Sequence, residues 1–68
     1  MSVKDRVLDL CKNAHISVAK LERETGISNG TVRWWKDTTK PNGKTLRAIA
    51  DYFGVTVDYL LTGEYEHS

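Results

Sequence analysis

The sequence has little of what small proteins commonly use to hold a fold together or to bind a cofactor. Its 68 residues include one cysteine, Cys11, so no disulfide can form within the chain. Cysteine and histidine follow no metal-binding spacing, and no nucleophile stands beside a base. Apolar runs are too short for a membrane span, and the N-terminus lacks the hydrophobic stretch of a signal peptide. We therefore expect a soluble, cytoplasmic domain that is not an enzyme, with no cofactor or metal and with Cys11 in its core rather than as a reactive thiol.

Net charge is also low, at +1, which taken alone argues against strong binding to nucleic acid. The charges are nevertheless unevenly distributed along the chain. Residues 31–47 contain five lysines and arginines and a single acid, Asp37, whereas residues 48–68 contain four acids and no lysine or arginine. This layout suits a basic face for phosphate beside an acidic end, but a chance cluster of solvated side chains fits it equally well.

Apolar residues recur at helical spacing throughout, and no segment alternates as a strand would. Polar residues that can cap a helix start, and glycines that can end one, divide the chain. The candidate caps are Ser2 (in a capping box with Asp5), Ser17, Ser28, Asn42 and Thr56, and the candidate terminal glycines are Gly26, Gly54 and Gly63. The helices expected from these signals span about 3–14, 18–25, 29–36, 43–53 and 57–62. They predict an all-α, compact five-helix bundle over residues 1–63, followed by a flexible tail at 64–68.

The second and third expected helices, joined by a tight turn at Gly26, have the proportions of a helix-turn-helix. A projection of residues 29–36 at about 100° per residue separates two faces. Val32 and Trp35 lie on the face expected to close the core against Leu21 and Ile27. The outward face consists of Asn29, Gly30, Arg33 and Trp34.

The outward face suits the major groove of DNA. Arg33 can bond O6 and N7 of guanine, Asn29 can bond N6 and N7 of adenine, and Gly30 would allow a close approach. Arg33 could instead be a solvated arginine, and Asn29 could support the helix start. Trp34 has three possible roles, namely contact with a thymine methyl or sugar, packing near Pro41, or a protein interface.

Two other helix starts predict phosphate contacts, because their first backbone N–H groups are free to bind an anion. One start is at Ser17 and the other is at Asn42. Lys36, Lys40 and Lys44 add positive charge near the second.

The run ISVAKLERETGISNGTVRWWKDTTKPNGKTLRAIADYFGVTVDYLLTG resembles the Cro/lambda-repressor-like (XRE) helix-turn-helix regulators, especially short repressors of phages and Gram-positive bacteria. The resemblance covers about residues 3–63, and its most specific parts are GIS, the W…P…L…IA…FGV spacing and VDYLLTG. It implies a five-helix, lambda-repressor-like domain that generally binds operator DNA as a dimer, with residues 28–36 as the reading helix in the major groove.

The resemblance also assigns roles to particular residues. Base-reading positions fall on Ser28, Asn29, Gly30, Arg33 and Trp34, and Ser17 and Val18 fall at the helix start that meets phosphate. The predicted phosphate contacts are Ser17, Val18, Thr31, Lys36, Lys40, Asn42 and Lys44. Many members of the family have Gln at the position of Val18. Glu22 replaces the usual small Ala, a variant also found in a subgroup of these repressors, and a polar or basic residue is more common at the position of Trp34.

The predicted function is sequence-specific binding of double-stranded DNA by a phage or bacterial repressor, acting as a dimer at an operator and located at the nucleoid. For the dimer surface, the first candidates are Tyr59, Leu60 and Leu61. The alternative is a protein-interaction module of the same fold that binds an antirepressor, another regulatory protein or a toxin. Val18 and Trp34 favour this alternative, because both replace polar character on the face that meets DNA.

Overall fold

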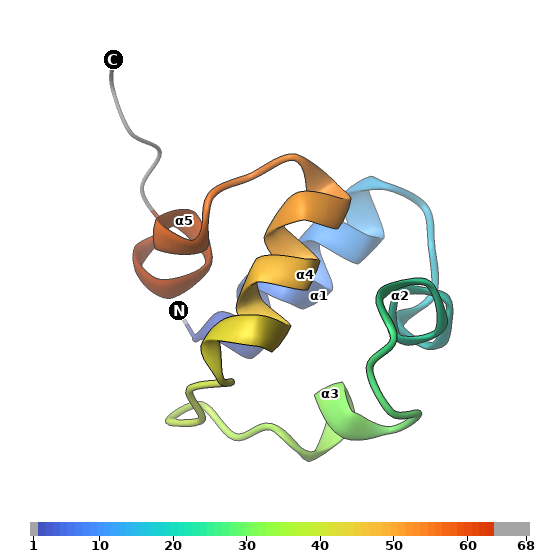
Figure 1. The fold of residues 1–68 in the computed structure, drawn as a ribbon, viewed down its shortest axis with the longest axis horizontal. Coiled ribbons are helices and arrows are strands. Elements are labelled where there is room, and N and C mark those ends of the chain that lie inside the picture. The colour runs from blue at the N-terminus through green and yellow to red at the C-terminus, as the bar shows by residue number, and fades with distance from the viewer. Residues whose placement is uncertain (1, 64–68) are drawn as a thin grey trace.

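The computed structural model describes residues 2–63, which form five helices and no strand (Figure 1). The helices are α1 (Val3–Asn13), α2 (Val18–Thr25), α3 (Thr31–Trp34), α4 (Gly43–Phe53) and α5 (Val57–Thr62). The predicted all-α fold is therefore confirmed, and four of the five predicted helices agree with the structure to within one residue. The tail expected at 64–68 lies outside the described residues. Within residues 2–63, no helix is long and apolar enough to cross a bilayer.

Four helices begin at the predicted caps. In each, the oxygen of the cap side chain accepts a hydrogen bond from the backbone N–H three residues later, which satisfies one of the N–H groups that a helix start leaves without a partner. The pairs are Ser2 with Asp5, Ser17 with Lys20, Asn42 with Thr45, and Thr56 with Tyr59. Local sequence thus determines where these helices start.

The third helix differs from its prediction. It spans Thr31–Trp34 rather than 29–36, and its N-cap is Gly30, not Ser28. Gly30 has no side chain with which to cap and adopts a left-handed conformation with φ of 89°. The backbone of Trp35 is extended (φ −65°, ψ 141°), so the helix stops after a single turn. Local propensity therefore does not set the ends of α3.

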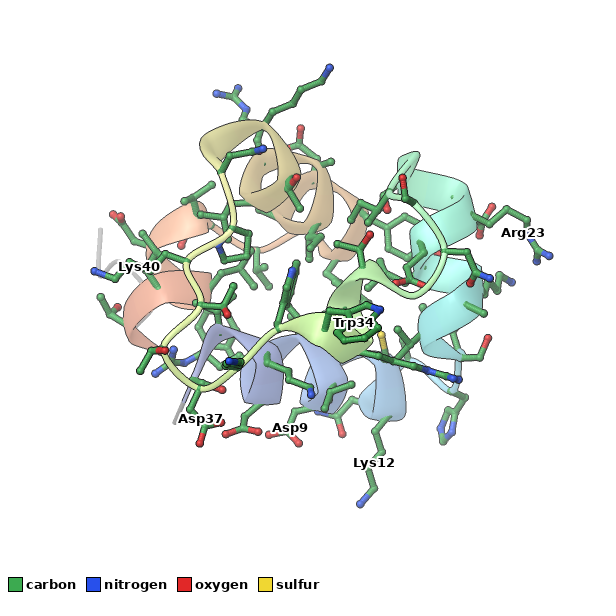
Figure 2. The ribbon with its side chains drawn as sticks, turned by 90° about the horizontal axis from the view of Figure 1, so that it is seen from below. Asp9, Lys12, Arg23, Trp34, Asp37 and Lys40 are labelled. Carbon is green, nitrogen blue, oxygen red and sulfur yellow. The ribbon has the colours of Figure 1, made fainter. Side chains whose placement is uncertain are left out.

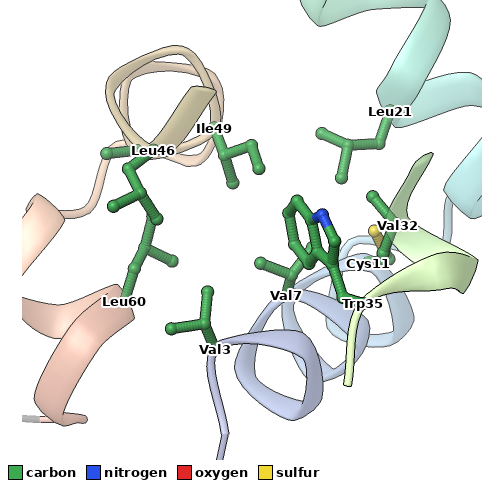
Figure 3. Packing of buried hydrophobic residues seen from close by; sticks show 10 residues of the cluster. Val3, Val7, Cys11, Leu21, Val32, Trp35, Leu46, Ile49 and Leu60 are labelled. Carbon is green, nitrogen blue, oxygen red and sulfur yellow. The ribbon is translucent and has the colours of Figure 1, made fainter. Parts of the chain in front are cut away.

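The hydrophobic core gathers residues from all five helices, and Figure 3 shows the indole of Trp35 in its midst, near Val7 and Val32. Val7 and Val32 are completely buried, and Trp35 is nearly so. The predicted inward positions, Val32 and Trp35, are thus confirmed. Cys11 is buried in the same core, as expected, and burial raises the pKa of its thiol, with a smaller effect in the same direction from the charge of Glu22.

A buried arginine joins the first helix to the last. Nη1 of Arg6 donates to the backbone oxygens of Leu60 and Leu61, at 3.1 and 3.2 Å, and so satisfies carbonyls at the end of α5. These bonds connect segments more than fifty residues apart in the sequence. Leu60 itself is completely buried in the domain, so the prediction that it belongs to a dimer surface is wrong, whereas Leu61 is exposed. Leu60 instead completes the core between α1, α4 and α5.

The contact between Arg6 and the end of α5 predicts unequal effects for two similar glycine substitutions. Gly54 and Gly63 both have left-handed backbone, with φ of 71° and 80°. A Cβ at position 54 would meet no atom within 4 Å, whereas one at position 63 would lie 2.8 Å from Nε of Arg6. Gly54→Ala should therefore cost only the backbone strain, about 1–2 kcal/mol, and Gly63→Ala should cost about 1–3 kcal/mol more because the buried guanidinium must move. Urea unfolding of both variants measures the difference, and equal losses would contradict this account of the α1–α5 contact.

Candidate nucleic-acid interface

Helices α2 and α3 form the helix-turn-helix. The turn begins at Gly26, whose φ of 77° gives the left-handed helix end that the sequence predicts. The backbone N–H groups of Gly26 and Ile27 both donate to the carbonyl oxygen of Glu22, which closes the end of α2. Among the other helices, α3 packs chiefly against α2. The orientation of the one-turn helix therefore depends mainly on α2.

The outer face of this unit carries the predicted base-reading side chains. Ser28, Asn29 and Arg33 are exposed, and Trp34 is 85% exposed, the highest value among the large hydrophobic side chains of residues 2–63. Figure 2 looks onto α3 and shows Trp34 near the centre of this face, with Lys40 and Arg23 at opposite edges. An indole so exposed does not pack on the loop near Pro41, which eliminates one of the three roles considered for it. The division of this segment into inward and outward residues is as predicted.

The first predicted phosphate site, at the start of α2, is only partly polar. The hydroxyl of Ser17 is exposed and caps the helix by accepting from the N–H of Lys20 at 3.0 Å. The side chain of Val18 is half-buried against the hydrophobic core. Val18 can therefore offer phosphate its backbone N–H but no side-chain contact.

The second predicted phosphate site, at the start of α4, adjoins the helix-turn-helix. A hollow of about 350 Å³ separates the turn from α4, and its walls include Ser28, Thr31, Lys44 and Thr45. It brings together Thr31 and Lys44, two predicted phosphate contacts from different helices. Asn42 caps α4 by accepting from the N–H of Thr45 at 2.9 Å.

The positive charge of residues 31–47 remains largely uncompensated. Within residues 2–63, Arg47 forms an exposed ion pair with Asp51 at 4.0 Å, whereas Arg33, Lys36, Lys40 and Lys44 form none; all four are exposed. The loop that carries Lys36 is ordered by a hydrogen bond from its N–H to the hydroxyl of Thr39, at 2.8 Å. The basic segment thus offers four charged side chains to an anionic partner.

Sequence reasoning missed two residues that support the outer face. Nζ of Lys4, on α1, donates to the carbonyl oxygen of Arg33 at 3.3 Å. The carboxylate of Glu22 is buried and accepts from the N–H groups of Gly30 and Val32, at 3.1 and 2.9 Å. Lys4 precedes its partner by 29 residues, and Glu22 precedes its partners by eight and ten. No short spacing rule links residues so far apart, so the sequence carried no signal for Lys4, and the one signal for Glu22 was its departure from the Ala usual at this position.

Residues 2–63 contain no group of three or more His, Cys, Asp or Glu side chains that could hold a metal ion. The polar groups brought together here are hydrogen-bond donors and cations around the exposed side of α3. Such a set can bind phosphate and read the edges of bases.

Comparison with known families agrees with this geometry. A family model described as the Cro/C1-type HTH DNA-binding domain matches residues 6–64 of the 68-residue chain. Neither the curated proteins nor the solved structures gave a significant match. The matched segment includes the whole helix-turn-helix and nearly all of the five-helix domain. The chain therefore belongs to the Cro/C1-type helix-turn-helix DNA-binding domains, a family of DNA-binding transcription regulators.

Proposed function

We propose that this protein is a sequence-specific repressor that binds an operator in double-stranded DNA as a dimer, with residues 28–36 in the major groove. The observation that carries the proposal is the arrangement around α3. Val32 and Trp35 bury one side of this segment, while Asn29 and Arg33 extend from the other with no ion pair or side-chain hydrogen bond among residues 2–63. Side chains held in this way are available to form hydrogen bonds with base edges. As a regulator of this kind, the protein acts at the nucleoid and is not an enzyme.

Affinity and specificity have separate sources in this proposal. The exposed lysines of residues 36–44 and the N–H groups at the starts of α2 and α4 contact phosphates, which positions the domain on any duplex. Ser28, Asn29 and Arg33 contact base edges, and Gly30 lets the backbone approach closely. One reading helix spans only a few base pairs, so two copies on a two-fold symmetric site would supply the specificity that an operator needs. Tyr59 and Leu61 remain candidates for the surface between the copies.

Trp34 reads an apolar feature of the groove in this proposal. Its ring stands on the outer face beside Arg33, and thymine presents a C5-methyl group in the major groove. The exposed basic side chains of residues 33–44 favour DNA over an apolar protein partner, because they complement the charge of its phosphates.

A second candidate function is a protein-interaction module that has kept the fold. Two observations favour it, the half-buried Val18 at the start of α2 and the 85% exposure of Trp34. An exposed tryptophan is a typical anchor of protein interfaces. The partner would be an antirepressor, another regulatory protein or a toxin.

Salt dependence of binding to random duplex DNA distinguishes the two functions. If Lys36, Lys40 and Lys44 each neutralise one phosphate, the logarithm of the association constant should fall with log salt at a slope of about −2.7 per domain. Changing the three lysines to glutamine should remove most of this slope. Absence of binding even at low salt would favour the interaction module.

Substitution of Arg33 tests base reading. We expect Arg33→Ala to weaken binding to the best duplex selected from random sequences by about 1–3 kcal/mol and to relax selectivity at one base position. Lys44→Ala is the matched control, because loss of a phosphate contact weakens binding to all sequences alike. Uniform weakening by Arg33→Ala would instead make Arg33 a phosphate contact.

Uracil substitution tests the role of Trp34. Replacing one thymine at a time by uracil in the selected duplex removes the C5-methyl and leaves base pairing intact. At one position this change should weaken wild-type binding by about threefold to tenfold, the contribution of roughly one buried methyl. Trp34→Ala should be insensitive to the same change. If Trp34→Ala retains full affinity, the residue does not contact DNA and its exposure points to the protein partner.

A further inference from the structure

The buried carboxylate of Glu22 lies between the two helices of the helix-turn-helix. Glu22 is on α2 and is 2% exposed, yet no lysine or arginine lies within ion-pair distance of it among residues 2–63. Both of its oxygens are used by the segment that follows the turn. Oε1 accepts from the N–H of Gly30 at 3.1 Å, and Oε2 accepts from the N–H of Val32 at 2.9 Å. Hydrogen bonds offset part of the hydration that a buried carboxylate loses, and among residues 2–63 both of those found for Glu22 go to the start of α3.

Helix α3 needs such support more than its neighbours do. It is a single turn of four residues, so it has few internal hydrogen bonds to offset the cost of starting a helix. The other four helices begin at a side-chain cap, whereas Gly30 supplies none. The Glu22 carboxylate takes over this role from another helix, and its negative charge suits the positive end of a helix.

The two bonds also restrict how α3 can rotate. They attach to residues 30 and 32 and come from one rigid group on α2, so a rotation of α3 about its axis would break at least one of them. Arg33 and Trp34 follow directly after Val32, and their directions are set by the same turn. We propose that Glu22 is a positioning residue for DNA reading: without touching DNA, it fixes the rotation of α3 on α2 and so aims Arg33 and Trp34 at the base edges. This inference rests on the proposed function.

The test compares Glu22→Gln with Glu24→Gln. Glutamine keeps the size of the side chain, but its NH₂ group would face one of the two N–H donors, so one bond is lost and a buried donor is left without a partner. Glu24 is on the same helix and exposed, so Glu24→Gln makes the same change of charge away from α3. We expect Glu22→Gln to lower affinity for the selected duplex by about tenfold. Affinity for random duplex should change by about twofold or less, because phosphate contacts at α2, α4 and the lysines remain. Glu24→Gln should leave the ratio of the affinities for selected and random duplex unchanged.

Two results would overturn the role of Glu22. The first is that Glu22→Gln and Glu24→Gln bind the selected duplex with equal affinity. The second is that Glu22→Gln, shown to be folded by circular dichroism, loses affinity for the selected and the random duplex by the same factor. Failure of the wild-type protein to select any duplex would instead overturn the proposed function itself, so the two failures are distinguishable.

Amide hydrogen exchange of the wild-type protein keeps the inference testable if Glu22→Gln does not fold. The N–H groups of Gly30 and Val32 should exchange much more slowly than that of exposed Asn29, which lies between Glu22 and its partners in sequence and has no hydrogen bond to its N–H among residues 2–63. Similar exchange rates at the three amides would show that the carboxylate does not hold α3, and the inference would be wrong.

Discussion

The attachment of one short helix to the rest of the domain is the constraint on which this structure depends. A single turn such as α3 is not stable alone, so groups outside it must hold it. Val32 and Trp35 hold it from the core side, and the carboxylate of Glu22 holds its start. The exposed side chains on its outer face take their direction from these three residues and from Lys4, whose Nζ donates to the carbonyl oxygen of Arg33. The rest of the bundle can be regarded as the support that keeps them in place.

Positive charge is concentrated in one part of the chain. The basic residues of 31–47 lie on α3, on the loop after it and in the first two turns of α4. Four of them are exposed and form no ion pair within residues 2–63. Net charge of the whole chain hides this concentration, since acids elsewhere cancel it. A small domain can therefore present a locally strong positive surface and remain nearly neutral.

Much of the fold could be predicted from the sequence because its signals are local. Four helices are capped by a side chain that accepts a hydrogen bond from the N–H three positions later, so both partners lie within one short stretch of sequence. The caps are Ser2, Ser17, Asn42 and Thr56. The ends of α3 could not be predicted, since they depend on tertiary contacts. Leu60 was named as a candidate for a dimer surface, but it is buried in the domain, and this burial follows from the docking of α5 on α1. The inward position of Val32 and the outward positions of Arg33 and Trp34 could be predicted from helical periodicity, whereas Trp35 is buried although it lies beyond the helix that the periodicity assumed.

The reach of Glu22 across the turn also has an evolutionary consequence. Position 30 normally has to supply its own cap, but here a neighbouring helix supplies it, so glycine is acceptable there. If Glu22 were lost, a capping residue such as Ser, Asn or Asp at position 30 could restore the missing acceptor once the backbone there became extended. The cap of α3 is therefore divided between positions 22 and 30, so a change at one alters what the other must supply. Such an exchange would leave the exposed side chains of α3 unchanged.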